Sequence, residues 1–195
     1  MPATASEPRD RLLRTAAGLF YSEGIGRVGI DRLVTQANVT RATFYRHFPS
    51  KDDLVVAYLR AEDQRLRIGV HQMLATEPAP PDALRNIAAA IGEGICLSGF
   101  RGCPFINAAA EYPDPQHPVR LVVRDHRAWF LDVVTEIIEK IAPAEAEPAA
   151  RQFVMLRDGA MVAGYTEEQE VAARSLREGT ENLLTQLGAT PAYSG

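Results

Sequence analysis

This chain is organised around residues 38–51, which read Asn38-Val39-Thr40-Arg41-Ala42-Thr43-Phe44-Tyr45-Arg46-His47-Phe48-Pro49-Ser50-Lys51. Thr40 is a good helix N-cap, because its hydroxyl can accept a hydrogen bond from an unpaired amide of the first turn. Phe44 and Phe48 are four residues apart, so both side chains lie on one side of the helix that follows. The stretch therefore predicts a short helix with one aromatic, buried face and one basic, hydrogen-bonding face.

A helix this short is not stable alone, so neighbouring helices must hold it. The preceding sequence predicts a helix over about residues 7–23, ended by Gly24 and Gly26, and a second helix over about residues 30–37. Asn38 tolerates the left-handed backbone that a tight turn between helices requires. Three short helices with a tight turn before the third form the helix-turn-helix layout, in which one helix enters the major groove of DNA.

The rest of the chain also reads as helix. Ser50 and Asp53 form a capping-box-like Ser-x-x-Asp at the start of a helix that runs to about Ala75. Asp82 is expected to cap the helix after the proline-rich break at residues 77–81. Apolar spacing predicts the remaining helices over about residues 82–95, 105–111, 119–141, 147–165 and 167–187. No stretch reads as a convincing strand, so the predicted fold class is all-α.

Composition is that of an ordinary globular protein, with 46% apolar and 24% charged residues. No run of about eighteen apolar residues is present, which argues against a membrane span. The first residues lack the apolar core of a signal peptide, so we expect a cytoplasmic protein. The two cysteines, Cys96 and Cys103, make neither a disulfide framework nor a set of zinc ligands, and we expect no metal or cofactor.

The net charge of −4 argues against a generic nucleic-acid coat protein, but the charge is unevenly spread. Residues 1–60 hold nine Lys and Arg against six Asp and Glu, whereas the rest of the chain holds twelve against nineteen. Such asymmetry is typical of a chain with one end facing nucleic acid. A difference of this size also arises by chance, so it serves as supporting evidence only.

The helix-turn-helix order followed by Thr-Arg-Ala-Thr-Phe-Tyr-Arg-His-Phe-Pro-Ser-Lys-Asp-Asp-Leu (residues 40–54) resembles the TetR family of bacterial transcriptional regulators. The run Phe44-Tyr45-x-His47-Phe48-x-x-Lys51 is its most specific part, and the motif-level similarity covers roughly Arg11 to Leu54. The resemblance implies about nine or ten helices, a homodimer and a palindromic operator in double-stranded DNA. It also implies a repressor with an N-terminal DNA-binding domain, residues 1–50, and a C-terminal domain, residues 51–195, that dimerises and binds a small-molecule effector.

The resemblance places residues 40–43 nearest the bases, puts Tyr45, His47 and Lys51 at positions that usually hold phosphates, and leaves Arg46 suited to either. Residue chemistry agrees, since Arg is the best bidentate reader of guanine and Thr can bond a base edge or touch a thymine methyl. Lys51 begins a helix whose free amides already favour a phosphate. His47 could instead satisfy a local backbone group. The predicted DNA contacts are Thr40, Arg41, Ala42, Thr43, Tyr45, Arg46, His47 and Lys51.

Two positions depart from the family's pattern. Gly29 stands where the family often has a Ser or Thr that caps the second helix, and Asn38 stands in the place of the usual turn glycine. Asn38 can adopt the same backbone as glycine. Gly29 can cap a helix but brings no side-chain contact to a phosphate, which puts one expected DNA contact in doubt.

Two groups of residues point to functions of the C-terminal domain. Ligand pockets are mostly apolar with a few placed polar groups, and two segments mix these types, although core packing is the alternative for their aromatic residues. The candidate pocket residues are Phe100, Cys103, Phe105, Asn107, Glu111, Tyr112, His126, Trp129 and Phe130. Small residues beyond residue 147 would allow a second copy to approach closely, or could serve packing within the chain. The candidate dimer-interface residues are Phe153, Leu156, Ala160, Met161, Gly164, Leu176 and Leu183.

Two rival interpretations remain open. A small helical enzyme would use Cys103 and His126, or Glu111, but no catalytic signature surrounds them, and a Cys–His pair acts only when its members are adjacent in space. A redox-sensing regulator would use Cys96 and Cys103, for which the alternative is two small buried hydrophobic residues. Turnover that is lost in Cys103→Ser would favour the enzyme, and peroxide-sensitive operator binding would favour the sensor.

Overall fold

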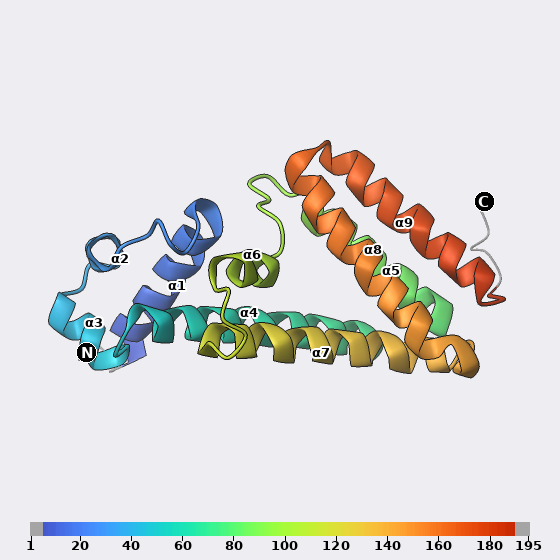
Figure 1. The fold of residues 1–195 in the computed structure, drawn as a ribbon, viewed down its shortest axis with the longest axis horizontal. Coiled ribbons are helices and arrows are strands. Elements are labelled where there is room, and N and C mark those ends of the chain that lie inside the picture. Colours follow the sequence, from blue (N-terminus) through green and yellow to red (C-terminus); the bar gives the residue numbers. More distant parts are fainter. Residues whose placement is uncertain (1–5, 190–195) are drawn as a thin grey trace. The chain divides into compact units, whose positions relative to one another are not determined.

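Figure 1 shows the computed structural model of the chain, which describes residues 6–189. The regular elements in this range are all helical, which confirms the all-α fold class. They are α1 (Ser6–Glu23), α2 (Ile30–Gln36), α3 (Arg41–His47), α4 (Lys51–Leu74), α5 (Pro80–Ile95), α6 (Pro104–Glu111), α7 (Pro118–Glu139), the 3-10 turn η1 (Pro143–Glu145), α8 (Ala146–Thr166) and α9 (Gln169–Gln186). None of the helices described is both long and apolar enough to cross a membrane.

The chain divides into two compact units, and α4 and α7 each contribute to both. The first unit comprises the described residues up to Arg65 and the segment Pro104–Asp125. The second unit comprises Leu66–Cys103 and the described residues from His126 onward. The first unit therefore contains α6 as well as the three helices of the helix-turn-helix. The domain boundary expected between residues 50 and 51 remains a prediction.

The first unit buries apolar faces of α1, α3 and α4. Leu12 of α1, Phe44 of α3 and Leu54 of α4 have no exposed surface. Phe48 is also buried, and its ring centroid lies 6.1 Å from that of Phe44. The prediction that both phenylalanines belong to the core is confirmed. Burial of two aromatic rings stabilises α3, which is too short to persist without its neighbours.

The tight turn between α2 and α3 ends α2 in a Schellman motif. The amide of Val39 donates to the carbonyl of Val34 at 3.0 Å, and the amide of Asn38 donates to the carbonyl of Thr35 at 3.2 Å. Asn38 has a φ of +51°, which confirms the left-handed conformation expected there. This turn satisfies the last carbonyls of α2 and fixes the direction in which α3 leaves it.

The backbone at Asn38 gives a first prediction. Alanine at this position should lower the free energy of unfolding by about 1 kcal/mol, because its Cβ disfavours a positive φ. Glycine should change stability by less, since it accepts this conformation at a small cost in unfolded-chain entropy. Urea unfolding of Asn38→Ala and Asn38→Gly checks the order. An alanine variant as stable as the glycine variant would contradict the importance of this turn conformation.

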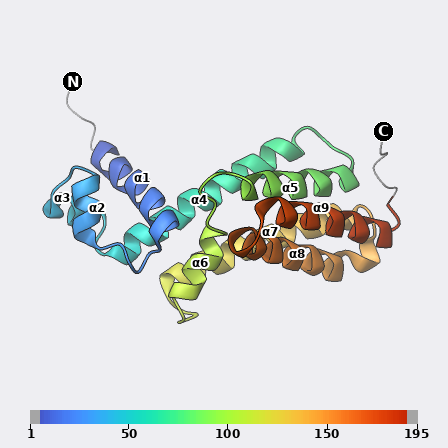
Figure 2. The same cartoon turned by 90° about the horizontal axis from the view of Figure 1, so that it is seen from above.

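In the second unit α5, α8 and α9 lie alongside one another (Figure 2). Glycines allow the close contacts: a Cβ added to Gly92 of α5 would lie 3.3 Å from the Cβ of Ala173 in α9. A Cβ added to Gly164 of α8 would collide with the side chain of Ile95 in α5. Phe153 of α8 is fully buried in this core. Gly92 and Gly164 thus serve packing within one chain.

The start of α5 differs from the expected one. The helix begins at Pro80 with Ala79 as its N-cap, so the prediction that Asp82 caps it is wrong. Proline fits the first helical turn, where no backbone amide donor is needed. The helix therefore starts at Pro80, two residues before the expected cap. Asp82 instead lies in the first turn and accepts a hydrogen bond from Nη1 of Arg85 at 2.9 Å. Arg85 also binds Glu181 of α9, with Nε 2.7 Å from Oε1.

Candidate nucleic-acid interface

The N-terminus of α3 is capped by Thr40, as the sequence predicts. The hydroxyl of Thr40 accepts a hydrogen bond from the amide of Thr43 at 3.1 Å, and the two threonine hydroxyls lie 3.0 Å apart. Gly29 caps α2 through its extended backbone and makes no side-chain hydrogen bond, also as predicted. The capped end of α3 therefore presents hydroxyl groups beside the first basic residue, Arg41.

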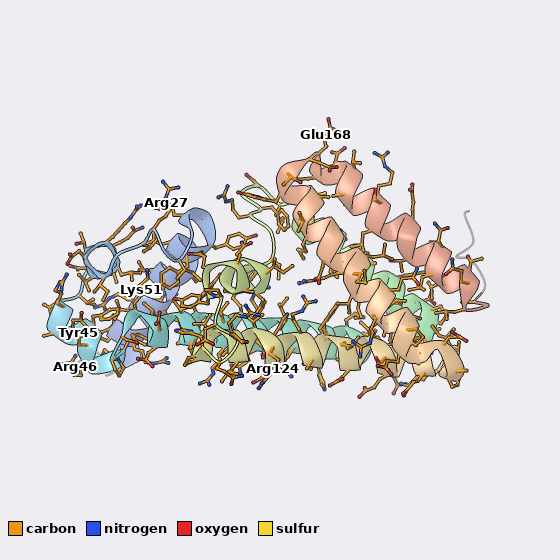
Figure 3. All side chains as sticks on the ribbon, viewed as in Figure 1. Arg27, Tyr45, Arg46, Lys51, Arg124 and Glu168 are labelled. Atoms are coloured by element: carbon orange, nitrogen blue, oxygen red, sulfur yellow. The ribbon has the colours of Figure 1, made fainter. Side chains whose placement is uncertain are left out.

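The eight predicted DNA contacts lie on α3, its N-cap and the first residue of α4. Five of them are exposed, namely Thr40, Arg41, Ala42, Tyr45 and Arg46. Thr43, His47 and Lys51 are half-buried. Tyr45 and Arg46 project from the end of α3 (Figure 3). All eight belong to one short stretch of the chain, residues 40–51, and their contact with DNA remains a prediction.

Tyr45 is exposed but held in place. Its ring packs edge to face on the buried ring of Phe44, with centroids 5.3 Å apart. Edge-to-face packing is a favourable geometry for aromatic pairs. The core of the first unit therefore orients the phenol group, while 46% of the residue's surface stays accessible.

Arg41 is paired with an acidic residue that the sequence reasoning did not single out. Its Nε and Nη2 both lie 2.7 Å from Oδ1 of Asp31 in α2. The hydrogen bond to Asp31 and the charge of that carboxylate raise the pKa of Arg41. Asp31 is exposed, so a negative charge stands on the surface predicted to meet phosphates. The pair holds the guanidinium of Arg41 beside α2, and its contact with a base remains a prediction.

This pair gives a second prediction. Asp31→Asn should tighten binding to scrambled duplex DNA by about two- to tenfold, because it removes a charge that repels phosphates. Binding to the preferred sequence should gain less, because Arg41 loses its orienting partner, so the ratio of the two affinities should fall. Titration of both duplexes at one salt concentration checks this. Glu7→Gln is the control, since Glu7 also forms an exposed ion pair, with Arg11 of α1; an unchanged ratio in Asp31→Asn would contradict the role.

His47 has an unusual environment. Its Nε2 is buried and has no hydrogen-bond partner among the described residues. The alternative that His47 satisfies a local backbone group therefore does not hold for Nε2. Buried polar atoms are nearly always paired, so Nε2 marks a local cost in stability. The phosphate contact of His47 remains a prediction.

Lys51 binds the backbone of its own unit. Its ammonium donates to the carbonyl of Ile25 at 2.6 Å, a contact that the sequence pattern could not reveal because the residues are 26 positions apart. An ammonium has three N–H groups, so donors remain for a phosphate. The predicted capping box beside it is confirmed: the amide of Ser50 donates to Oδ2 of Asp53 at 2.9 Å, and the amide of Asp53 donates to Oγ of Ser50 at 3.1 Å.

The nine candidate pocket residues do not all fall in one compact unit. Phe105, Asn107, Glu111 and Tyr112 belong to the first unit, whereas Phe100, Cys103, His126, Trp129 and Phe130 belong to the second. Glu111 and Tyr112 contact other parts of the first unit, described below. The effector pocket remains a prediction.

The candidate pocket residues of the second unit include a row of aromatic rings with cations beside them. The ring centroids of His126 and Trp129 are 5.5 Å apart, and those of Trp129 and Phe130 are 6.2 Å apart. The guanidinium carbon of Arg67 lies 4.5 Å from the centroid of the Trp129 ring, and that of Arg157 lies 5.7 Å from the centroid of the Phe130 ring. Such cation–π contacts are strongest where water is excluded.

Arg157 is buried and has charged and polar partners. It donates to Oδ1 of Asp158 at 2.8 Å and to the sulfur of Cys103 at 3.3 Å. Burial alone would raise the pKa of Asp158, but hydrogen bonds from Arg127 and Arg157 outweigh it and lower the pKa. Both cysteines are free thiols, with Cys103 buried and Cys96 exposed.

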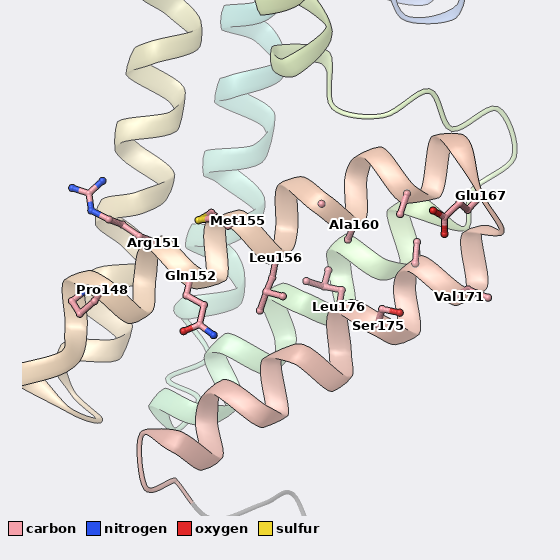
Figure 4. A pocket seen from close by; sticks show the side chains of 13 residues that line it. Pro148, Arg151, Gln152, Met155, Leu156, Ala160, Glu167, Val171, Ser175 and Leu176 are labelled. Atoms are coloured by element: carbon pink, nitrogen blue, oxygen red, sulfur yellow. The ribbon is translucent and has the colours of Figure 1, made fainter.

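A groove of about 730 Å³ runs along α8 and α9 (Figure 4). Three of the predicted dimer-interface residues line it: Leu156, Ala160 and Leu176. Met161 is half-buried, and Phe153, Gly164 and Leu183 are buried within the chain.

The groove region also exposes apolar side chains that the sequence analysis missed. Met155 is 73% exposed and lines the groove, as does Val171, and Val162 of α8 is 51% exposed. The signal was present in the two apolar runs of α8, residues 153–156 and 160–163. A run of four apolar residues covers more than one face of a helix, so one face can pack inside while another stays exposed.

Known proteins similar to this chain share its helix-turn-helix segment and its fold. Residues 12–58 match the sequence model of "Bacterial regulatory proteins, tetR family". The crystal structure of SCO4454, a TetR-family transcriptional regulator from Streptomyces coelicolor, is similar with a TM-score of 0.90. The two sequences are 48% identical over 93% of this chain and 96% of that one.

Two mycobacterial proteins are similar over part of the chain. The transcriptional activator FasR of Mycolicibacterium smegmatis is 36% identical over 36% of this chain and 32% of its own length. The transcriptional repressor KstR2 of the same species is 31% identical over 48% of this chain and 47% of its own length.

Proposed function

The chain belongs to the TetR family of bacterial transcriptional regulators, and from this premise we propose that it is a repressor. As a member of the family it is a DNA-binding regulator of transcription. In the proposal, a homodimer binds a palindromic operator in double-stranded DNA, and a small-molecule effector releases it. Its place of action is then the bacterial cytoplasm, where the operator lies.

The observation that carries the proposal is the exposed face of α3. Thr40, Arg41 and Arg46 stand on its solvent side, while Phe44 and Phe48 anchor the opposite side in the core. This combination allows a short helix to enter a groove without losing its own support. Arg and Thr are suited to base edges in the major groove, where each base pair presents a distinct pattern of donors and acceptors.

The groove on α8 and α9 supports the homodimer. Monomeric proteins rarely leave large contiguous apolar surfaces in water, and Met155 and Val171 stand exposed along this groove. Two-fold symmetry suits the function, because paired recognition helices about 34–36 Å apart reach successive major grooves on one side of the duplex. We propose that α8 and α9 of two copies form the interface.

We propose that the domain over residues 51–195 binds the effector and that the protein acts on transcription by repression. The aromatic row from His126 to Phe130, with Phe153 beyond it, offers flat apolar surfaces, and Arg67 and Arg157 offer positive charge. Ligand sites combine these two kinds of group. FasR and KstR2 regulate in opposite directions by their names, so the proposal of repression depends on the wider family pattern.

Selection of bound sequences from a pool of random duplexes tests the proposal. A repressor of this kind should enrich one palindromic sequence, and addition of a chemically varied metabolite mixture should release the bound duplex. Enrichment of no sequence above the starting pool would overturn specific DNA binding. Enrichment without release by any added compound would overturn effector control alone.

A further inference from the structure

The turn between α1 and α2 is held by two charged side chains from distant parts of the sequence. Oε1 of Glu111, at the end of α6, accepts a hydrogen bond from the amide of Ile25 at 2.9 Å, and its Oε2 accepts one from the amide of Gly26. The ammonium of Lys51 donates to the carbonyl of Ile25 at 2.6 Å. Residues 25 and 26 therefore have three of their four backbone polar groups bound by ionised side chains.

The chemistry of the two partners is matched to the groups that they bind. A carboxylate is a pure acceptor with two oxygens, so Glu111 can bind two successive amides at once. An ammonium is a pure donor, so Lys51 binds the carbonyl. Hydrogen bonds with one ionised partner are roughly twice as strong as neutral ones. Ile25 is buried, so its amide and carbonyl have little access to water, whereas the bond from the amide of Gly26 to Glu111 is exposed.

The glycines of the turn, Gly24 and Gly26, leave room for the carboxylate of Glu111. A Cβ added to Gly26 would lie 3.0 Å from Oε2 of Glu111, and one added to Gly24 would lie 3.5 Å from Oε1. Gly24 also has a φ of +91°, which other residues rarely adopt. The carboxylate of Glu111 thus approaches the backbone at a place where side chains are absent.

The segment after Glu111 is tied to the start of α4. The hydroxyl of Tyr112 donates to Oδ1 of Asp52 at 2.8 Å, and the ring of Tyr112 lies 4.6 Å from that of His117. Burial and the bond to Asp52 raise the pKa of Tyr112, which keeps its hydroxyl a donor. The backbone of Glu111 is therefore anchored through the neighbouring residue, and its carboxylate has a defined position.

The turn connects directly to the helices that carry the predicted DNA contacts. It leads into α2, which carries Asp31, and Asp31 holds the guanidinium of Arg41 on α3. A second ion pair, between Glu23 and Arg32, joins the end of α1 to α2 across the same turn. A change in the turn would shift α2 and, with it, the partner that orients Arg41.

We propose that Glu111 is a positioning residue for operator binding. Its carboxylate fixes the turn at residues 25–26, and the turn fixes α2 and the orientation of Arg41. The inference depends on the proposed function, because operator binding is what the positioning serves. Glu111 belonged to the candidate pocket residues, and this role assigns it instead to the helix-turn-helix.

Two variants test the role by different means. Glu111→Gln keeps the size of the side chain but replaces one acceptor oxygen by an amide group that cannot accept from an N–H. Gly26→Ala keeps the charge of Glu111 and places a Cβ against its carboxylate. Glu93→Gln is the matched control, because Glu93 is exposed on α5 and its substitution removes the same charge.

The readouts are affinity for the selected operator, affinity for a scrambled duplex, hydrogen exchange of the amides of Ile25 and Gly26, and thermal unfolding. We expect both variants to weaken operator binding by roughly three- to thirtyfold, which is less than the roughly 10- to 150-fold value of a full hydrogen bond to a charged group, because Glu111 acts on DNA only through the turn. Binding to the scrambled duplex should not weaken, because the number of phosphate contacts is the same and the loss of a negative charge does not reduce attraction to phosphates. The two amides should exchange faster, and the control should match the wild type.

Different results overturn different claims. Variants that discriminate the two duplexes as well as the wild type would overturn the role of Glu111. Equal losses on both duplexes together with a lower unfolding temperature would also overturn it, since that pattern shows a purely structural contact. A wild-type protein that does not discriminate the duplexes would overturn the proposed function, and this inference with it.

Discussion

Met155→Glu in α8 is expected to convert the protein to a monomer in solution and to weaken operator binding by about 10²–10⁴-fold. A dimer binds both half-sites at once, and linking two binding events raises the affinity over that of a single half-site by this factor. A monomer loses that gain. Met155 is 73% exposed in the single chain, so a carboxylate at this position should leave the protomer folded. Placed inside an apolar dimer interface, however, the same carboxylate would be buried without a partner.

Sedimentation equilibrium and operator titration measure the two effects of Met155→Glu. Leu97→Glu is the matched control, because Leu97 is 65% exposed and lies outside α8 and α9. The control should remain a dimer and bind the operator normally. A dimeric Met155→Glu protein would show that the interface does not use the groove on α8 and α9.

Arg41→Ala is expected to weaken operator binding by about 5- to 150-fold and to relax the base preference at one position in each half-site. The reason is that one bidentate contact to a base edge is lost while the phosphate contacts remain. Affinity for a scrambled duplex should change much less. The side chain of Arg41 is 56% exposed, so its loss should not disturb the core.

A repeated selection from random duplexes measures the base preference of Arg41→Ala. Arg124→Ala is the control, since Arg124 also forms an exposed ion pair, with Asp125, in the same unit. The control should reproduce the wild-type sequence preference. A uniform loss across all sequences in Arg41→Ala would instead assign Arg41 to a phosphate.

Local features of the fold could be predicted well from the sequence. The cap at Thr40, the capping box at Ser50 and Asp53, and the left-handed Asn38 depend on residues within a few positions of each other. Hydrogen-bonding and steric preferences act at that range, so the sequence pattern reports them directly. The wrong prediction at Asp82 also concerns local preferences. Asp82 and the prolines before it are both good helix starts, and the helix begins at the proline.

Contacts between distant residues could not be predicted in this way. Glu111 binds a turn 85 residues earlier in the chain, and the periodicity of α6 says only that the residue ends a helix. Asp31 and Arg41 lie on different helices, and nothing in the spacing marks them as partners. The sequence also does not show which face of α8 is buried. Phe153 and Met155 are both apolar, although Phe153 is buried and Met155 is exposed.

The central claim is that two copies of α3 read successive major grooves of one operator. Methylation interference on the selected operator tests it most directly, because a methyl group on guanine N7 blocks contacts in the major groove. The account predicts two symmetric clusters of interfering guanines, about 10–10.5 base pairs apart from centre to centre. A single cluster, or interference by no guanine, would contradict it.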